Sequence, residues 1–292
     1  MVPTQQRFGG DWTAEKLERV KKYLAAYAKI MTKQRFRFAY VDAFAGTGYR
    51  TMKEENSDEL MLPEFAEQDA EAFLEGSARI ALQVKPRFTR YIFIEKDQGR
   101  FDELNKLKND FPGLQKDIVL VNAEANEYLN DLCQNYRWDK HRAVLFLDPY
   151  GMQVTWNTVE AIAKTKAIDL WYLFPLGVAV NRLLKKDGRI DEVLKKRLDK
   201  IFGTTKWYEA FYKTETATSL FGEQAVTKKV ANMEAIGQYF VKRMQKIFAS
   251  VADNPLPLYN SRRNPLYLLC FASGNPKGAT TAVKIAQDIL AR

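Results

Sequence analysis

The sequence is poor in cysteine and histidine. Its 292 residues include two cysteines, Cys133 and Cys270, and one histidine, His141. Two thiols in a chain of this length support neither a disulfide scaffold nor a thiolate metal cluster, and one imidazole does not support a histidine-based metal site. We therefore expect no metal centre, and we expect His141 to be a loop or strand-entry side chain. No nucleophile-elbow motif supports a Ser-His-Asp hydrolase.

Long apolar runs are missing as well. No run approaches the ~20 residues that span a bilayer, and the polar N-terminal stretch has no secretory apolar region. These absences predict a cytoplasmic protein that makes no contact with a membrane. The hydrophobic content of 46% is sufficient for one buried sheet with helices on both faces.

The chain does contain a regular alternation of apolar strands and amphipathic helices. Strands are predicted at 38–42, 91–95, 118–122, 143–148 and 168–174, and helices at 12–33, 77–84, 98–109, 125–135 and 155–165. This order predicts an α/β fold with a mostly parallel sheet, helices on both faces and right-handed crossovers.

Three segments make up the predicted domain organisation. Residues 1–175 form the core, and residues 51–76 are an acidic insertion within it, either a lid or a solvated surface loop. A mainly helical elaboration follows at 176–263, with its best helices at 192–202 and 232–248. Residues 264–292 return to the core as a strand, 266–271, and a helix, 279–290.

The end of the first strand has the spacing of a cofactor-binding turn. Asp42 marks the carboxyl end of the strand, Phe44 follows it, and Gly46 and Gly48 let the backbone turn where a side chain would block a ligand. A dinucleotide fingerprint would need a third glycine or alanine where Thr51 stands. The spacing D-x-F-x-G-x-G instead resembles motif I of class I S-adenosylmethionine (SAM) methyltransferases, although a glycine pair after a strand also fits an ordinary tight turn.

Two further strands end in polar residues. Glu95 ends the strand 91–95, where an acidic side chain accepts hydrogen bonds from ribose hydroxyls; the alternative is a solvated residue in a charge cluster. Asn122 ends the next strand, where an amide could bind the edge of an adenine ring or simply form a turn.

The turn Asp148-Pro149-Tyr150 follows the fourth strand and would carry the chemistry. It resembles the D/N-P-P-Y/F turn of amino-methyltransferases, in which the acidic or amide side chain and a backbone carbonyl bind the target amine and the aromatic ring stacks on the base. An aryl amine is a poor nucleophile, so acceptors aimed at its hydrogens are needed to orient its lone pair. One proline of the motif is missing here and Gly151 follows Tyr150, so the segment also fits a plain turn.

A wider resemblance joins these motifs to one family. The segments that carry it are 38–48, Gly76-Ser77-Ala78, Phe93-Ile94-Glu95, 146–156 and 168–176. Together they look like the three-Cys-motif partner protein family (TcmP), over most of the chain. This resemblance implies a Rossmann-like class I methyltransferase fold, a SAM pocket and, as a partner, a three-Cys-motif protein that is itself reminiscent of radical-SAM proteins.

The charge balance favours an anionic partner. Lysine and arginine number 45 against 36 acidic residues, for a net charge of +9. The surplus is concentrated at 19–37 and 182–200, where it could neutralise phosphates, or could form the solvated faces of two helices. Aromatic residues lie near both clusters and are expected to stack on exposed bases: Tyr23, Tyr27, Phe36, Trp207, Tyr208, Phe211 and Tyr212.

Two functions follow from these observations. The first is a SAM-dependent methyltransferase that acts on an amino group of RNA or DNA, with Asp42, Phe44, Gly46, Gly48, Glu95 and Asn122 in the cofactor pocket and Asp148, Pro149 and Tyr150 as catalytic residues. The alternative is a non-catalytic methyltransferase-like partner of nucleic acid or of a three-Cys-motif protein. Under the first hypothesis, Asp148 is predicted at the end of the strand beside the one that bears Asp42.

Overall fold

The computed structural model describes residues 11–46, 76–219 and 222–291. At its centre is an eight-stranded sheet in the order β3-β2-β1-β4-β5-β10-β8, with β9 paired to β10. The strands of this sheet are β1 (Arg37–Asp42), β2 (Arg90–Glu95), β3 (Ile118–Asn122), β4 (His141–Leu147), β5 (Ile168–Phe174), β8 (Ser250–Val251), β9 (Leu256–Tyr259) and β10 (Pro265–Ser273). Strands β1 to β5 are parallel and β10 is antiparallel to β5, so the mostly parallel sheet predicted from the sequence is confirmed.

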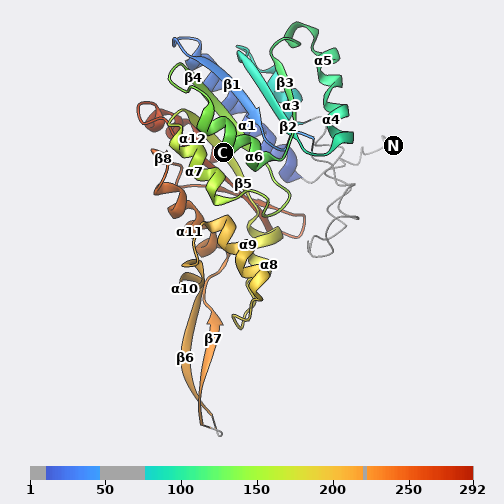
Figure 1. Ribbon diagram of the computed structural model, residues 1–292. Coiled ribbons are helices and arrows are strands. Elements are labelled where there is room, and N and C mark those ends of the chain that lie inside the picture. The colour runs from blue at the N-terminus through green and yellow to red at the C-terminus, as the bar shows by residue number, and fades with distance from the viewer. Residues whose placement is uncertain (1–10, 47–75, 220–221, 292) are drawn as a thin grey trace, which may run out of the picture.

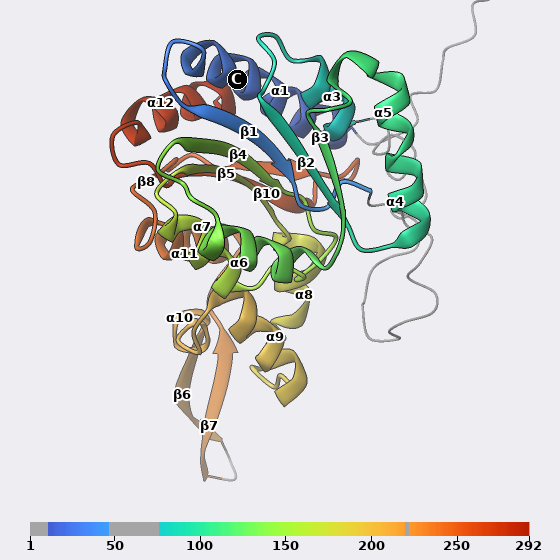
Figure 2. The same cartoon turned by 45° about the horizontal axis from the view of Figure 1, so that its top comes forward.

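Helices cover both faces of the sheet (Figure 2). Helices α1, α3 and α12 lie on one face, and α6, α7 and α11 lie on the other. The α-helices of the described chain are α1 (Asp11–Met31), α3 (Ser77–Gln83), α4 (Gln98–Leu104), α5 (Lys106–Asp110), α6 (Ala125–Asn135), α7 (Trp156–Lys164), α8 (Asn181–Leu183), α9 (Glu192–Phe202), α10 (Trp207–Phe211), α11 (Met233–Gln245) and α12 (Ala279–Leu290). None of the helices in this part of the chain is both long and apolar enough to cross a membrane.

Strand β5 shows why the sheet needs both layers. All seven of its residues are buried, as expected for a parallel strand that is covered on both faces. Trp171 and Leu173 point into the core beneath α1 and α12, whereas Tyr172 and Phe174 point into the core beneath α7 and α11. The ring of Phe174 stacks on Phe240 of α11 at a centroid distance of 4.0 Å. The segment after β5 therefore packs into the same core as the sheet.

The order in which the chain adds strands to the sheet reverses between β1 and β4. From β1 the chain proceeds outward through β2 and β3, and it then returns to place β4 on the other side of β1. At such a reversal, the loops beyond the carboxyl ends of the two central strands diverge and leave a crevice for a ligand. A ligand site is therefore expected beyond the carboxyl ends of β1 and β4.

The segment 176–263 contains more strand than the sequence pattern predicts. Besides helices α8 to α11, it forms β8, β9 and a separate hairpin of β6 (Tyr212–Ser219) and β7 (Gly222–Lys229), which projects away from the body of the molecule (Figure 1). The hairpin strands are rich in threonine and have few apolar residues, so they lack the alternating apolar pattern of a half-buried strand. Strand β8 has two residues, and β9 contains Pro257, which obscures its strand signal.

Candidate functional site

Three carboxylates lie at the ends of three neighbouring strands. Asp42 is the last residue of β1, Glu95 is the last residue of β2, and Asp148 directly follows β4. Strand β1 pairs with both β2 and β4, and Asp42 is in register with Phe146. The predicted position of Asp148, beyond the strand next to that of Asp42, is therefore confirmed. All three side chains are buried.

Asp42 organises the turn that follows β1. Its Oδ1 accepts a hydrogen bond from the backbone N–H of Phe44 at 3.3 Å, and its Oδ2 accepts one from the hydroxyl of Tyr40 at 3.2 Å. Burial raises the pKa of Asp42 to about 6, and the negative charge of Asp148 adds to this rise. Phe44 is itself part of the buried core. Asp42 therefore stabilises the turn by a hydrogen bond, and Phe44 anchors it in the core.

Gly46 and Glu95 fit closely together. A Cβ atom on Gly46 would lie 2.8 Å from Cγ and from Oε2 of Glu95, which is too close for any other residue without a shift. The Oε1 atom of Glu95 accepts a hydrogen bond from the backbone N–H of Asp97 at 2.7 Å. Its Oε2 atom is buried and has no hydrogen-bond partner in the described structure. Burial raises the pKa of Glu95, while the Asp97 N–H, the charge of Arg100 and the backbone N–H of Gly46 oppose the rise.

An unpartnered carboxylate oxygen at this position fits the ribose of a nucleotide-like cofactor. A buried acceptor without a donor is costly, and a ribose hydroxyl would supply the missing donor. Gly48, which was predicted for the same pocket, lies outside the described residues, and so does the insertion up to residue 75.

Asn122 supports the same corner of the sheet. Its side-chain Nδ2 donates to the backbone carbonyls of Glu95 at 3.1 Å and of Lys96 at 3.2 Å. These bonds tie the end of β3 to the loop after β2. The side chain is exposed, and its carbonyl oxygen is the group that can contact an adenine edge.

Asp148 forms a buried ion pair that the sequence interpretation missed. Its Oδ2 accepts from Nζ of Lys16 at 2.8 Å, and the two side chains are 5% and 2% exposed. Lys16 comes from α1, and its Nζ also lies 4.7 Å from the ring centre of Trp12. Burial raises the pKa of Asp148, and Lys16 opposes the rise. A signal was present in the sequence, because Lys16 interrupts an otherwise apolar stripe with Trp12 and Val20 at a spacing of four.

Strand β10 and helix α1 enclose the turn after β4. Pro149 is buried and Tyr150 is half-buried. The backbone N–H of Tyr150 donates to Oε1 of Gln153 at 3.3 Å, and its carbonyl accepts from the hydroxyl of Tyr267 at 3.4 Å. The ring of Tyr267 stacks on Trp12 at 5.1 Å. Segments from three parts of the chain thus hold the Asp148-Pro149-Tyr150 turn in place.

The aromatic residues beside the basic clusters have a structural role that differs from the predicted one. Trp207, Phe211 and Tyr212 are almost completely buried, and so are Tyr23 and Tyr27. The indole N–H of Trp207, for example, donates to Oδ1 of Asp199 at 2.7 Å. The prediction that these five rings stack on exposed bases is therefore wrong, because all five rings are shielded from the outer surface of the molecule.

The basic side chains of this region are exposed. They lie on and around α8 and α9 at Arg182, Lys185, Lys186, Arg189, Lys196 and Lys200. Figure 1 places these helices beside the base of the projecting hairpin. An exposed cluster of this kind can contact phosphates without base stacking.

Comparison with known proteins assigns no family to the chain. No family model matches it, and no curated protein matches it. The resemblance to the three-Cys-motif partner family therefore stays a prediction.

Several solved structures are similar to the chain at low sequence identity. Protein LPL1258 from Legionella pneumophila has 14% sequence identity and a TM-score of 0.48, over 97% of this chain and 92% of that chain. A spermidine synthase in complex with the transition state analogue AdoDATO has 11% identity and a TM-score of 0.42, over 91% and 60%. A SAM-dependent methyltransferase from Clostridium acetobutylicum has 12% identity and a TM-score of 0.35, over 89% and 95%. All three TM-scores are below 0.5, so these similarities assign neither an activity nor a substrate.

Proposed function

We propose that the protein is a SAM-dependent methyltransferase that acts on an amino group of nucleic acid. The observation that carries the proposal is the row of buried carboxylates at the ends of β2, β1 and β4, in which Oε2 of Glu95 has no hydrogen-bond partner among the described residues. In this arrangement Glu95 serves a cofactor ribose, Asp42 holds the turn between the two sites, and Asp148 serves the substrate.

The cofactor half of the site consists of Gly46, Glu95 and Asn122. When bound, SAM would supply an electrophilic methyl group on a sulfonium. Glu95 would accept from the ribose hydroxyls, and the absence of a side chain on Gly46 lets the Glu95 carboxylate occupy this position. The oxygen of the Asn122 side chain would contact the adenine edge.

The substrate half consists of Asp148 and the turn after it. Within the described chain, Lys16 is the side chain that hydrogen-bonds Asp148, and it holds Oδ2, which leaves Oδ1 to accept from a substrate amine. The carbonyl of Pro149 is positioned by the same turn and offers a second acceptor. Two acceptors orient the two amine hydrogens and thereby direct the nitrogen lone pair. The raised pKa of Asp148 suits this carboxylate to take up the proton that the amine gives up.

The exposed basic side chains of α8 and α9 support nucleic acid as the substrate class. They provide a phosphate-binding surface beside a hairpin that projects from the body. Because the neighbouring aromatic rings are buried, this surface would bind the backbone and would leave base recognition to the turn at Asp148.

A second candidate function is supported by the Lys16–Asp148 pair itself. Asp148 is buried and already paired with Lys16 at 2.8 Å, as expected for a carboxylate that only stabilises the turn. Under this alternative the protein is a methyltransferase-like partner that binds nucleic acid or a three-Cys-motif protein and transfers no methyl group.

Transfer of a labelled methyl group distinguishes the two functions. The full-length protein is incubated with methyl-tritiated SAM and total cellular RNA or DNA, and acid-precipitable label is counted. We expect label in one of the two nucleic acids, and a loss of about 100-fold or more in Asp148→Asn, which keeps the shape of the side chain. The matched control, Asp139→Asn, changes an exposed carboxylate and should keep full activity. Nucleic acid that co-purifies but gains no label would support the second function and contradict the first.

A further inference from the structure

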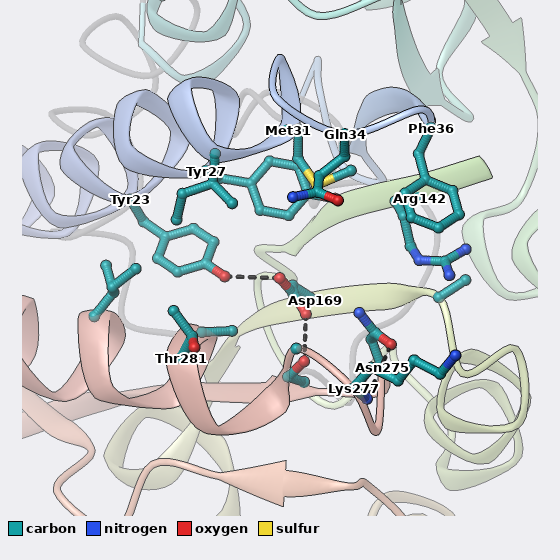
Figure 3. Close-up of a pocket in the computed structure, with 16 residues that line it drawn as sticks. Tyr23, Tyr27, Met31, Gln34, Phe36, Arg142, Asp169, Asn275, Lys277 and Thr281 are labelled. Carbon is teal, nitrogen blue, oxygen red and sulfur yellow. Dashed lines mark hydrogen bonds between the residues drawn. The ribbon is translucent and has the colours of Figure 1, made fainter. Parts of the chain in front are cut away.

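A cavity of about 310 Å³ lies between α1 and α12, at the amino ends of strands β4 and β5 and so at the opposite end of these strands from Asp148. Its walls come from the second half of α1, the first residues of β4 and β5, the end of β10 and the first two turns of α12 (Figure 3). Strand β4 separates it from the turn at Asp148, and a strand of seven residues spans roughly 20 Å. The cavity is therefore distinct from the proposed methyl-transfer site, and the argument for it does not depend on that site.

Arg142 gives one end of the cavity a fixed positive charge. Its Nη1 donates to the backbone carbonyls of Trp138 at 3.0 Å and of His141 at 2.7 Å, and its guanidinium lies 3.9 Å from the ring centre of Phe36. Its Nε is buried and has no hydrogen-bond partner among the described residues. The guanidinium is thus held in position by neutral groups, and no described carboxylate forms an ion pair with it.

Two more groups at this end favour an anion. Lys277 is exposed, and Figure 3 shows it and Asn275 on the same side of the cavity as Arg142. The 12-residue helix α12 begins at Ala279, two residues after Lys277, and its N-cap, Gly278, provides no side-chain cap; the backbone N–H of Ala279 donates to the carbonyl of Asn275 at 2.8 Å. The amino end of a helix carries a partial positive charge, so it adds to the attraction for an anion.

Asp169 is the carboxylate of the cavity wall, and its charge interacts with that of Arg142. Its Oδ2 accepts from the hydroxyl of Tyr23 at 2.7 Å, and its Oδ1 accepts from the hydroxyl of Ser273 at 2.5 Å. Figure 3 shows both bonds and places Asp169 behind the centre of the cavity. Burial raises its pKa to about 6, with Arg142 opposing the rise. Both oxygens accept hydrogen bonds within the protein, so among the described residues Asp169 fixes the wall and forms no hydrogen bond with Arg142 or Lys277.

The remaining walls are mostly apolar. The rings of Tyr23 and Tyr27, the side chain of Met31 and, from α12, Ile285 line this part of the cavity. Tyr27 is held flat against Phe88 at a centroid distance of 6.1 Å. A rigid apolar wall with a cationic end binds a molecule that has an apolar ring and one negative group.

We propose that this cavity is a second ligand site, which binds a small organic anion with an aromatic body. The aromatic body lies along Tyr23 and Tyr27, and the anionic group, a carboxylate, sulfonate or phosphate, lies between Arg142, Lys277 and the amino end of α12.

The dye 8-anilinonaphthalene-1-sulfonate is a suitable probe, because it joins an aromatic body to one anionic group and its fluorescence reports on its surroundings. With the folded full-length protein we expect saturable enhancement at a stoichiometry of one. Lys277→Gln should lower the affinity for the dye by about tenfold, because one charge-assisted contact is lost. Arg142→Gln should lower it by at least as much. The neutral analogue N-phenyl-1-naphthylamine should respond to neither substitution.

A filling variant ties the signal to this cavity. Thr281 lines it, so Thr281→Trp should abolish dye binding, whereas Thr280→Trp, an exposed neighbour outside the lining, should leave it unchanged. Near-ultraviolet circular dichroism confirms that each variant is folded. Three results would overturn the proposal: no saturable binding to wild type, equal binding by wild type and Thr281→Trp, or an affinity for the dye that Lys277→Gln does not change.

Discussion

At the scale of single residues, the Lys16–Asp148 pair joins stability to the proposed chemistry. The two charged atoms lie 2.8 Å apart and are almost completely shielded from water. Two buried charges stabilise each other only as long as both are present, because each alone lacks solvation. Asp148 therefore contributes to the stability of the fold as well as to the proposed chemistry, and an activity assay on Asp148 variants needs a stability measurement beside it.

A double-mutant cycle tests this pairing. We expect Asp148→Ala to lower the free energy of unfolding by roughly 3–5 kcal/mol, because it leaves the Lys16 ammonium buried without a partner. Lys16→Met in the same chain should restore most of that loss, since methionine fills a similar volume without charge. Urea unfolding of the wild type, both single variants and the double variant gives the coupling energy. Additive effects of the two substitutions would show that the residues do not interact.

Asp169 makes a second residue-scale prediction, about pH. Its folded pKa of about 6 lies above its ordinary value of 3.8, so the folded protein holds this proton more tightly than the unfolded chain does. The resulting stability is fully present below about pH 4 and is lost as the pH rises through 6, by roughly 3 kcal/mol. Asp169→Asn has no such loss, so its free energy of unfolding relative to wild type should rise between pH 4 and pH 7.

Denaturant unfolding of both proteins at several pH values measures that difference. Subtracting the two curves removes the contribution of Asp42, whose pKa is also raised to about 6. A difference that stays constant between pH 4 and pH 7 would mean that the proton affinity of Asp169 is the same in the folded and unfolded states.

At the scale of secondary structure, elements with clear end signals could be predicted from the sequence. Helix α9 begins after Asp191, whose side chain accepts from the backbone N–H of Leu194, and ends at Gly203, which has a φ of 65°. Both are known end signals, and the predicted range 192–202 is confirmed. By contrast, the predicted helix 98–109 is divided at Asn105 into α4 and α5. The apolar spacing continues through this break, so the pattern alone did not reveal it.

The exposed lysines of α9 make an element-scale prediction. If this helix contacts phosphates, Lys196→Gln and Lys200→Gln should each weaken RNA or DNA binding and should each reduce the slope of log affinity against log salt by about 1. Lys106→Gln, an exposed residue of α5 on a different part of the molecule, is the control. Fluorescence anisotropy with a labelled oligonucleotide at several salt concentrations gives both values. Unchanged slopes in the α9 variants would remove this helix from the nucleic-acid surface.

At the scale of the whole molecule, the sheet could be predicted and the closure of the site could not. Alternating strands and helices specify parallel neighbours, and polar residues at strand ends indicate the active edge. The contacts that complete the site join residues far apart in the chain: Lys16 and Asp148 are separated by 132 positions, and Tyr150 and Tyr267 by 117. No local pattern specifies such a pair, because it depends on how α1 and β10 pack against the finished sheet.

The two proposed sites lie at opposite ends of the parallel strands, and α1 contributes to both. The first turns of this helix bring Trp12 and Lys16 to the carboxyl edge, and its later turns bring Tyr23 and Tyr27 to the cavity at the amino edge. Variants in one half of α1 should therefore be measured for binding at both edges.

Titration calorimetry with SAM tests most directly whether the carboxyl edge of the sheet is a cofactor site. We predict binding in the micromolar range to the wild type, and a loss of about 10-fold to 100-fold in Glu95→Ala, because the acceptor for the ribose hydroxyls is removed. Gly46→Val should weaken binding as strongly, since its side chain would displace the Glu95 carboxylate. Glu103→Ala, an exposed change on α4, should bind as the wild type does. Folded wild-type protein that gives no heat with SAM, or a Glu95→Ala variant that binds it unchanged, would contradict the proposed site.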